Sequence, residues 1–374
     1  MQPRRHPTVS LTYEERASLP NNSPVAAFLL RLISIKHTNL CVSADVTSTA
    51  ELLQLAEEVG DSICVLKTHA DIVQDFGDRT IQGLRDVAKR RKFLVFEDRK
   101  FGDIGSTVQK QYAAGPLGIV KWAAITNAHI FPGPAIAIAL EQAAKSAIAA
   151  YNTRVETEIS AGTPPPSSAS ESDDEDSRPD ASHADDDPTA WPAERQGRKP
   201  SVVSVSTTIS TKTEAISPQP TPRSPELGAE SMEAALERLG PPPFLRALLL
   251  LAEMSSEGNL LTGAYTEQCV AIARQHRDFV MGFVAQRSLN VEKGDNFVTM
   301  TPGVNLPPPG QEGKKMGDAL GQQYNTPRKV VLEMGCDVII VGRGILNAPD
   351  RRRAAERYRK EGWAAYEERI RAKR

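Results

Sequence analysis

The ten residues V-F-E-D-R-K-F-G-D-I, numbered 95–104, mark a point where an apolar segment ends in a cluster of charge. Residues 93–96 are apolar, and the charged residues that follow are Glu97, Asp98, Arg99, Lys100 and Asp103. An apolar strand with charges at its C-terminal end is typical of the active site of an α/β enzyme. Because side chains alternate along a strand, Asp98 and Lys100 are expected to point to the same side.

Lys100 lies between two carboxylates, Asp98 and Asp103, in this stretch. Each carboxylate stabilises the charged form of the lysine, which therefore stays protonated. Such a cation is placed to meet developing negative charge or to deliver a proton. Taken alone, the same pattern also fits a solvated turn with ordinary salt bridges, so the rest of the chain has to decide between the two interpretations.

Composition limits the classes of function. The chain has 374 residues with a net charge of −2 and a pI of about 6.4, which gives no indication of a nucleic-acid partner. The four cysteines lack C-x-x-C spacing and are predicted to be buried thiols in a reducing compartment. No secretory signal is recognised, and the longest apolar run, residues 247–252, is too short to span a membrane. A cytoplasmic protein is expected.

Residues 160–243 differ in composition from the rest of the chain. They hold 14 of the 27 prolines, together with acidic runs at 171–176 and 185–187. Such a segment buries too little apolar surface to offset its ordering entropy. The prediction is a disordered insertion over 151–243. The domain prediction places capping helices in 1–38, the first half of a barrel in 39–150, and its second half with a C-terminal helix in 244–374.

Outside this segment, short apolar runs alternate with helical patterns. Strands are predicted at 39–46, 63–69, 93–98, 124–130, 248–254, 279–285, 298–302 and 337–341. Helices are predicted at 11–19, 24–34, 48–59, 79–90, 104–114, 134–150, 265–275, 326–334 and 350–373. Eight continuously apolar strands that alternate with helices predict a (β/α)8 TIM barrel, whose parallel strands are covered on both faces.

In such a barrel the C-terminal ends of all strands meet at one rim, where the active site lies. The residues expected at this rim are Asp45, Lys67, Asp98, Lys100, Ser255, Pro302 and Arg343. Any single one of these charges would also fit a helix cap or a surface ion pair. Several of them at strand ends together favour a functional site.

A second signal follows the last strand, in the stretch V-G-R-G-I at 341–345. Glycines there let backbone N–H groups approach an anion, and Arg343 beside Gly342 can hold a phosphate through two hydrogen bonds. Gln322 and Tyr324, in the stretch G-Q-Q-Y at 321–324, are expected at the same phosphate. The alternative is a tight turn with an exposed arginine. His69 and His129 are interpreted as hydrogen-bonded structural residues at the rim, and no metal site is predicted.

These motifs together resemble orotidine 5′-phosphate decarboxylase of the fungal type. The resemblance covers almost the whole chain outside the insertion, and D-R-K-F-x-D-I-G with K-T-H upstream is its most specific part. The stretches that carry it are A-D-V at 44–46, L-K-T-H-A-D-I at 66–72, F-E-D-R-K-F-G-D-I-G at 96–105, T-N-A-H at 126–129, L-L-A-E-M-S-S at 250–256, M-T-P-G-V at 300–304, G-Q-Q-Y at 321–324 and I-I-V-G-R-G-I at 339–345.

The resemblance implies a carboxy-lyase that converts orotidine 5′-monophosphate (OMP) to UMP and CO2 without cofactor or metal. It implies that Lys100 protonates C6, within a charge array with Lys67 and Asp98. It implies a homodimer with shared active sites, in which the partner subunit contributes Asp103. The other implied contacts are Asp45 and Thr107 to the ribose, Ser255 and Pro302 to the pyrimidine, and Gln322, Tyr324, Gly342 and Arg343 to the phosphate.

Two alternatives stay open from the sequence. A related phosphate-binding barrel lyase, such as a metal-dependent 3-hexulose-6-phosphate synthase, shares the D-x-K-x-x-D pattern. Lys67 and the G-Q-Q-Y stretch argue against this alternative. The other is a catalytically idle scaffold that presents the acidic insertion to a partner.

Overall fold

Eight parallel strands close into a barrel in the computed structural model of the chain, which describes residues 6–152, 155–162, 202–209, 230–261, 263–307, 310, 316–317 and 321–372. Each barrel strand pairs with the next along the chain, and the last pairs with the first. The strands are β1 (Leu40–Ala44), β2 (Val65–Thr68), β3 (Leu94–Phe101), β4 (Ile125–Ala128), β7 (Ala247–Leu251), β8 (Val280–Val284), β9 (Val298–Thr301) and β12 (Val338–Val341). The predicted (β/α)8 barrel is confirmed.

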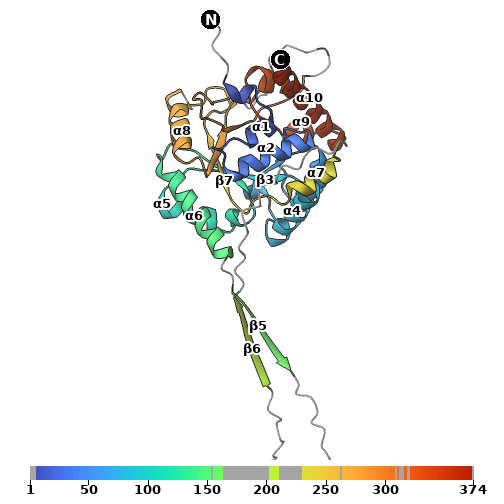
Figure 1. Ribbon diagram of the computed structural model, residues 1–374. Coiled ribbons are helices and arrows are strands. Elements are labelled where there is room, and N and C mark those ends of the chain that lie inside the picture. Colours follow the sequence, from blue (N-terminus) through green and yellow to red (C-terminus); the bar gives the residue numbers. More distant parts are fainter. Residues whose placement is uncertain are drawn as a thin grey trace, which may run out of the picture. The chain divides into compact units, whose positions relative to one another are not determined.

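Helices surround the barrel on the outside (Figure 1). They are α1 (Tyr13–Ala17), α2 (Pro24–Lys36), α3 (Thr49–Val59), α4 (Asp78–Arg91), α5 (Gly105–Ala113), α6 (Ala135–Asn152), α7 (Met232–Leu239), α8 (Gly263–Gln275), α9 (Arg343–Leu346) and α10 (Arg351–Arg371). Short 3-10 turns lie at η1 (Pro7–Val9), η2 (Gly60–Ser62), η3 (Ala70–Ile72) and η4 (Ile119–Lys121).

Local sequence explains where several helices begin. Thr12 and Glu15 form a reciprocal capping box at the start of α1, and the Ser23 hydroxyl accepts from the Ala26 amide ahead of Pro24, the first residue of α2. Asp350 caps α10 by accepting from the Arg353 amide. Each side chain satisfies an amide that has no partner within its helix, which fixes the helix start.

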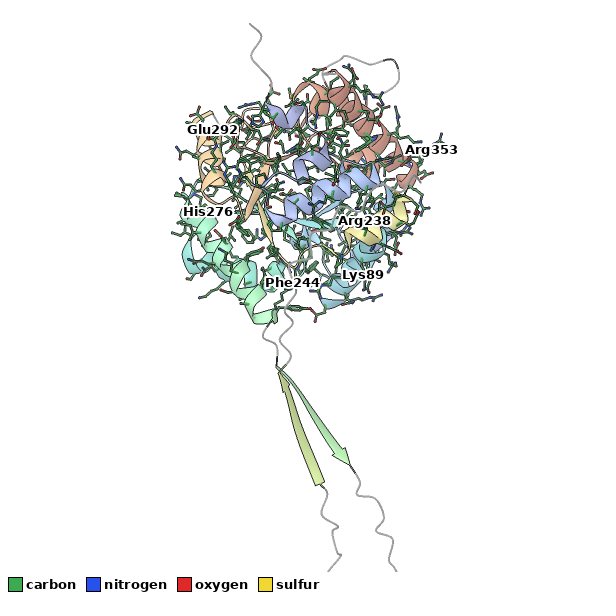
Figure 2. All side chains as sticks on the ribbon, viewed as in Figure 1. Lys89, Arg238, Phe244, His276, Glu292 and Arg353 are labelled. Atoms are coloured by element: carbon green, nitrogen blue, oxygen red, sulfur yellow. The ribbon has the colours of Figure 1, made fainter. Side chains whose placement is uncertain are left out.

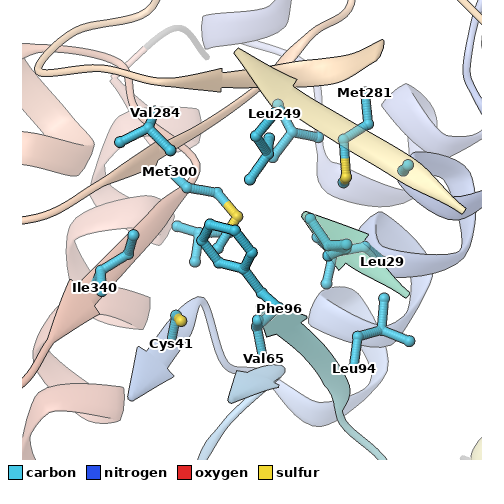
Figure 3. Close-up of a cluster of buried hydrophobic side chains, with 14 of the residues drawn as sticks. Leu29, Cys41, Val65, Leu94, Phe96, Leu249, Met281, Val284, Met300 and Ile340 are labelled. Carbon is cyan, nitrogen blue, oxygen red and sulfur yellow. The ribbon is translucent and has the colours of Figure 1, made fainter. Parts of the chain in front are cut away.

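Apolar side chains from the strands fill the interior of the barrel. Figure 3 shows Cys41 of β1, Val65 of β2, Phe96 of β3 and Met300 of β9 among them, and all four are fully buried. Every residue of the barrel strands is buried except three near the end of β3, residues 98–100. The packed interior therefore gives way to accessible polar groups where the charge cluster lies.

The N-terminal helices cover one end of the barrel, as predicted. Arg16 of α1 forms a buried ion pair with Asp337, the residue directly before β12. The guanidinium also donates to the Asn296 side chain at 2.9 Å, near the start of β9. Because a buried charge is costly unless it is paired, this contact fixes α1 against the N-terminal ends of the strands. The opposite rim is left for the site.

The structure refines three predicted elements. The helix predicted at 326–334 is helical over 327–333, with π-helical geometry in η5 (Lys329–Glu333). A short helix, α9, follows β12 and was not predicted. The strand predicted at 248–254 ends at Leu251, because the amides of Ala252 and Glu253 both turn to the Val284 carbonyl. Ser255 therefore lies in a loop rather than at a strand end.

The chain divides into two units, one formed by residues 1–150 and 214–374 and the other by residues 151–213. In the second unit, β5 (Val155–Gly162) and β6 (Val202–Ile209) pair antiparallel. The predicted long insertion between α6 and β7 is confirmed, although its last part, residues 230–243, belongs to the barrel unit and includes α7. Residues 153–154, 163–201 and 210–229 of that segment lie outside the described part of the chain.

Helix α7 belongs to the barrel unit, although the insertion was predicted to include it. Lys89 of α4 and Leu236 of α7 line a common cavity of about 680 Å3, which the side chains of Phe28, Leu84 and Phe244 make largely apolar. Figure 2 labels Lys89 and Arg238 on this side. Apolar contact with α2 and α4 explains why this part of the Pro- and Ser-rich segment is helical.

The other global predictions concern cysteines and membrane spans. All four cysteines are buried and unpaired, which confirms the predicted thiols. Within the residues that the structure describes, no helix has the length and apolar character needed to cross a bilayer.

Candidate active site

Lys67, Asp98 and Lys100 form a cluster where β2 and β3 reach the rim. Lys67 Nζ lies 2.6 Å from Asp98 Oδ2, and Lys100 Nζ lies 2.7 Å from Asp98 Oδ1. The side chains of Lys67 and Asp98 are only 8% and 10% exposed, whereas that of Lys100 is 35% exposed. The least buried ammonium of the cluster therefore faces the space that a ligand would enter.

Asp98 is ionised in this environment. Burial by itself would raise the pKa of its carboxyl, but the ammonium groups of Lys67 and Lys100 outweigh burial and hold the pKa well below its usual range. The carboxylate in turn forms an ion pair with each of the two lysines. The arrangement fixes a cation, that of Lys100, beside a buried anion.

His69 completes the cluster on the β2 side. Its Nε2 lies 2.7 Å from Lys67 Nζ, 3.4 Å from Asp98 Oδ2 and 3.7 Å from Asp45 Oδ1. Burial and then the Lys67 charge lower the pKa of the imidazole. In the neutral ring, Nε2 accepts a hydrogen bond from the Lys67 ammonium, since an ammonium group can only donate. This geometry agrees with the predicted hydrogen-bonded histidine at the rim.

Asp45 follows β1 directly and lies close to the loop after β12. The Ser43 hydroxyl donates to Asp45 Oδ1 at 2.7 Å, and the Asp45 side chain is 44% exposed. A Cβ atom added to Gly342 would lie 3.4 Å from Asp45 Oδ2. The absence of a side chain at 342 keeps this part of the rim open.

A second group connects the loops after β7 and β9. The Gln322 side-chain amide donates to Ser255 Oγ and to the Gln323 carbonyl, both at 2.8 Å. Pro302 follows β9, and Gly303 has a φ of +73° in contact with the same groups. A Cβ atom on Gly303 would lie only 2.5 Å from Gln322 Nε2. Glycine is therefore required where these loops meet.

Tyr324 and Arg343 form a third group. The guanidinium carbon of Arg343 lies 5.6 Å from the centre of the Tyr324 ring, a cation–π contact that orients the arginine. Arg343 is the first residue of α9 and directly follows Gly342. Tyr324 ends β11 (Gln323–Tyr324), which pairs with β10 (Met316–Gly317). Two of the four residues predicted at the phosphate, Tyr324 and Arg343, are therefore in contact.

Asp103 and Thr107 lie apart from these groups. Asp103 Oδ1 accepts from the Ile104 amide at 2.8 Å, and Oδ2 accepts from Gln111 Nε2 at 3.2 Å. Among the described residues, Asp103 forms no ion pair with Lys100 in its own chain. Thr107 is exposed on α5. Sequence proximity of Asp103 to Lys100 thus does not translate into contact within one subunit.

The sequence analysis assigned no role to two buried residues beside the cluster. Asn127, in the middle of the predicted strand 124–130 and next to last in β4, donates to Asp98 Oδ1 at 2.7 Å. Glu97 accepts from Thr68 Oγ1 at 2.6 Å and from the Ala70 amide at 3.0 Å, on the other side of β3 from Asp98. The available signal was the polar side chain of Asn127 within the predicted strand 124–130. In the described residues, no group of three or more His, Cys, Asp or Glu side chains is arranged to hold a metal ion.

Comparison with known proteins gives the same family as the motifs. A model of the orotidine 5′-phosphate decarboxylase / HUMPS family matches residues 38–161 and 224–358. The orotidine 5′-phosphate decarboxylase of Aureobasidium pullulans is 49% identical over 363 residues, which cover 97% of this chain and 96% of that protein. The enzymes of that name from Hypocrea atroviridis and Rhizopus oryzae are 43% and 38% identical, over 98% and 96% of this chain and 99% and 96% of their own lengths. This chain belongs to the orotidine 5′-phosphate decarboxylase / HUMPS family.

Proposed function

We propose that this protein decarboxylates OMP to UMP and CO2, a step of pyrimidine nucleotide biosynthesis. The observation that carries the proposal is the pair of lysines on one buried carboxylate, with Lys67 and Lys100 at 2.6 and 2.7 Å from the two oxygens of Asp98. Family membership and the names of the relatives at 38–49% identity support the same reaction.

The chemistry requires a fixed cation. When the bond from C6 to the carboxylate breaks, CO2 leaves and the electron pair stays on C6, in an orbital that the ring π system does not stabilise. The Lys100 ammonium stabilises this pair and then transfers its proton to C6, and the neutral amine regains a proton from solvent. Asp98 holds the Lys100 ammonium in place through their contact at 2.7 Å, and Lys67 holds Asp98 by its other oxygen at 2.6 Å. The proposed reaction uses no metal or organic cofactor.

The remaining rim residues are proposed to bind the parts of OMP that do not react. Asp45 contacts the ribose, and Ser255 with Pro302 contacts the pyrimidine. Gln322, Tyr324, Gly342 and Arg343 hold the phosphate, and the contact between Arg343 and Tyr324 supports their shared role. Binding energy from the phosphate, remote from C6, organises the site for the reaction.

We also propose a homodimer whose active sites are shared. Asp103 and Thr107 of one subunit reach the OMP site of the other. Apolar side chains near Asp103 support an interface there, since Ile104 is 55% exposed and Phe131 is 68% exposed. Phe131 lies against Gly102, where an added Cβ would come within 2.8 Å of its ring. Exposed apolar groups of this kind mark association surfaces.

A cytoplasmic location is part of the proposal, supported by four buried thiols that suit a reducing compartment. The proposed domain arrangement keeps a barrel in two halves around an inserted segment. All of the proposed catalytic and binding residues belong to the barrel. Removal of residues 163–201 from the inserted segment is therefore expected to leave OMP turnover unchanged.

The test is consumption of OMP by the purified full-length chain after treatment with a metal chelator. Turnover that persists without metal supports the proposal. Turnover that requires added magnesium would favour a metal-dependent lyase of the same family, and an absence of turnover above the uncatalysed background would refute the proposal.

A further inference from the structure

Asn127 lies where β3 departs from regular pairing with β4. Glu97 pairs with Thr126 and Phe101 pairs with Ala128, so residues 98–100 of β3 face Asn127 alone. The backbone bonds that a regular ladder would supply across this interval are therefore missing. Asn127 is fully buried, and its side chain lies inside the irregularity.

The amide of Asn127 makes two contacts there, one with each of the residues that carry the proposed chemistry. Its Oδ1 accepts from the Lys100 backbone amide at 2.7 Å. Its Nδ2 donates to Asp98 Oδ1 at 2.7 Å, the same oxygen that Lys100 Nζ contacts. A single side chain thus fixes the backbone of the proposed proton donor and the orientation of its carboxylate.

The Lys100 backbone needs such support because it is strained. Its φ is +52°, in the left-handed region that side chains other than glycine rarely adopt. In the described residues only His37 and Lys92 share this feature without being glycine, and both end helices, where left-handed residues are common. Lys100 adopts the conformation inside a strand, where strain persists only if surrounding contacts enforce it.

We propose that Asn127 is a positioning residue for the decarboxylation, and this inference rests on the proposed function. By holding the left-handed turn at Lys100 and the Asp98 carboxylate together, it directs the Lys100 ammonium toward the substrate. Asn127 itself has no role in binding the ribose or phosphate. Its loss should lower kcat while leaving the binding of the unreacting groups intact.

Two substitutions separate positioning from general stability. Asn127→Ala removes both contacts and is expected to lower kcat for OMP about 100-fold, as a misplaced catalytic group does. UMP lacks the reacting carboxylate, and its affinity should stay within about threefold of wild type. The contacts to the ribose and phosphate, which do not change during the reaction, are left intact by the substitution. Asn127→Asp preserves the shape and the acceptor to the Lys100 amide.

The kcat of Asn127→Asp, measured as a function of pH, distinguishes a positioning role from a purely structural one. When ionised, the new carboxylate faces Asp98 and repels it. When protonated, its O–H donates to Asp98 Oδ1 as the amide did. The kcat of this variant relative to wild type should therefore rise as pH falls.

Asn290→Ala is the matched control. Asn290 is also a buried asparagine, with its Nδ2 donating to the Phe297 carbonyl and its Oδ1 accepting from the Phe297 amide, both at 2.9 Å. It lies before β9, at the strand end opposite the rim. The control should lower the melting temperature but leave kcat within about twofold of wild type, since only contacts in the transition state change kcat.

The inference is overturned if Asn127→Ala retains kcat within about threefold of wild type, if Asn290→Ala loses as much kcat, or if the loss appears as weaker UMP binding. It is also overturned if the relative kcat of Asn127→Asp does not change with pH, which decides the matter should Asn127→Ala not fold. A wild-type chain without OMP turnover overturns the proposed function and this inference together. Wild-type turnover with an unaffected Asn127→Ala overturns the inference alone.

Discussion

Lys67 and Lys100 contact opposite oxygens of a single carboxylate, with their Nζ atoms 2.6 Å from Oδ2 and 2.7 Å from Oδ1 of Asp98. The three side chains carry a net positive charge where β2 and β3 meet the rim. Of the two ammonium groups, that of Lys100 is the more exposed and is the one that a ligand can reach. A substrate carboxylate and the electron pair that it leaves behind both meet this cation.

Removal of the Lys100 ammonium should abolish most of the activity without unfolding the protein. Lys100→Ala is expected to lower kcat for OMP by at least about 1,000-fold, because both charge stabilisation and proton transfer are lost. Asp98 keeps its contact with Lys67, so the free energy of unfolding should change by less than about 1 kcal/mol. Steady-state kinetics and chemical denaturation measure the two effects.

Lys89→Ala is the control for this substitution, since Lys89 is exposed on α4 and lines the cavity beside α7 rather than the rim. It should leave kcat unchanged. Near-normal turnover by Lys100→Ala would show that another group protonates the product.

Shared active sites predict complementation between two inactive variants. Lys100→Ala and Asp103→Ala homodimers should each be inactive. A mixed dimer regains one intact site, so an equal mixture that exchanges subunits freely should recover about a quarter of wild-type activity. Activity measured after mixing under conditions of subunit exchange checks this. If Asp103 acts within its own chain, the mixture stays inactive.

Much of the fold and part of the site could be predicted because parallel barrel strands are buried on both faces and appear as continuous apolar runs. Strand ends then located Lys67, Asp98 and Lys100. Ser255 was placed at a strand end because the apolar run extends past Leu251, whereas backbone hydrogen bonding ends β7 there. The left-handed Lys100 and the irregular pairing around Asn127 depend on contacts between strands that sequence periodicity does not report.

Glu97 predicts a pH dependence of stability. Burial raises its pKa from 4.5 to about 7, against the opposing hydrogen bonds from Thr68 and the Ala70 amide. The folded protein thus holds this proton to higher pH than the unfolded chain, so the contribution to stability is complete below pH 4.5 and is lost as pH rises through about 7. The shift corresponds to roughly 3 kcal/mol.

Glu97→Gln cannot ionise and should remove this dependence. The difference in the free energy of unfolding between variant and wild type, measured with urea at several pH values, should shift in favour of the variant by roughly 3 kcal/mol between pH 4 and pH 8. A difference that stays constant across this range would mean that Glu97 titrates normally in the folded protein.

Gly303→Ala tests the junction of the loops after β7 and β9. The added Cβ would lie 2.5 Å from Gln322 Nε2 and 2.6 Å from the Gln323 carbonyl. Displacement of Gln322 should raise the KM for OMP about tenfold or more, the cost of one hydrogen bond to a charged group. Gly258→Ala is the control, with a similar φ of +72° but open space around its Cβ. Equal effects of the two substitutions would assign the loss to backbone strain.

The most direct test of the central claim is the reaction of OMP with the chelator-treated chain in D2O, followed by NMR. A protonated Lys100 exchanges its hydrogens with solvent, so the account predicts UMP that carries deuterium at C6, formed together with CO2 and without added metal. Formation of no UMP, or formation only when magnesium is supplied, would contradict the account.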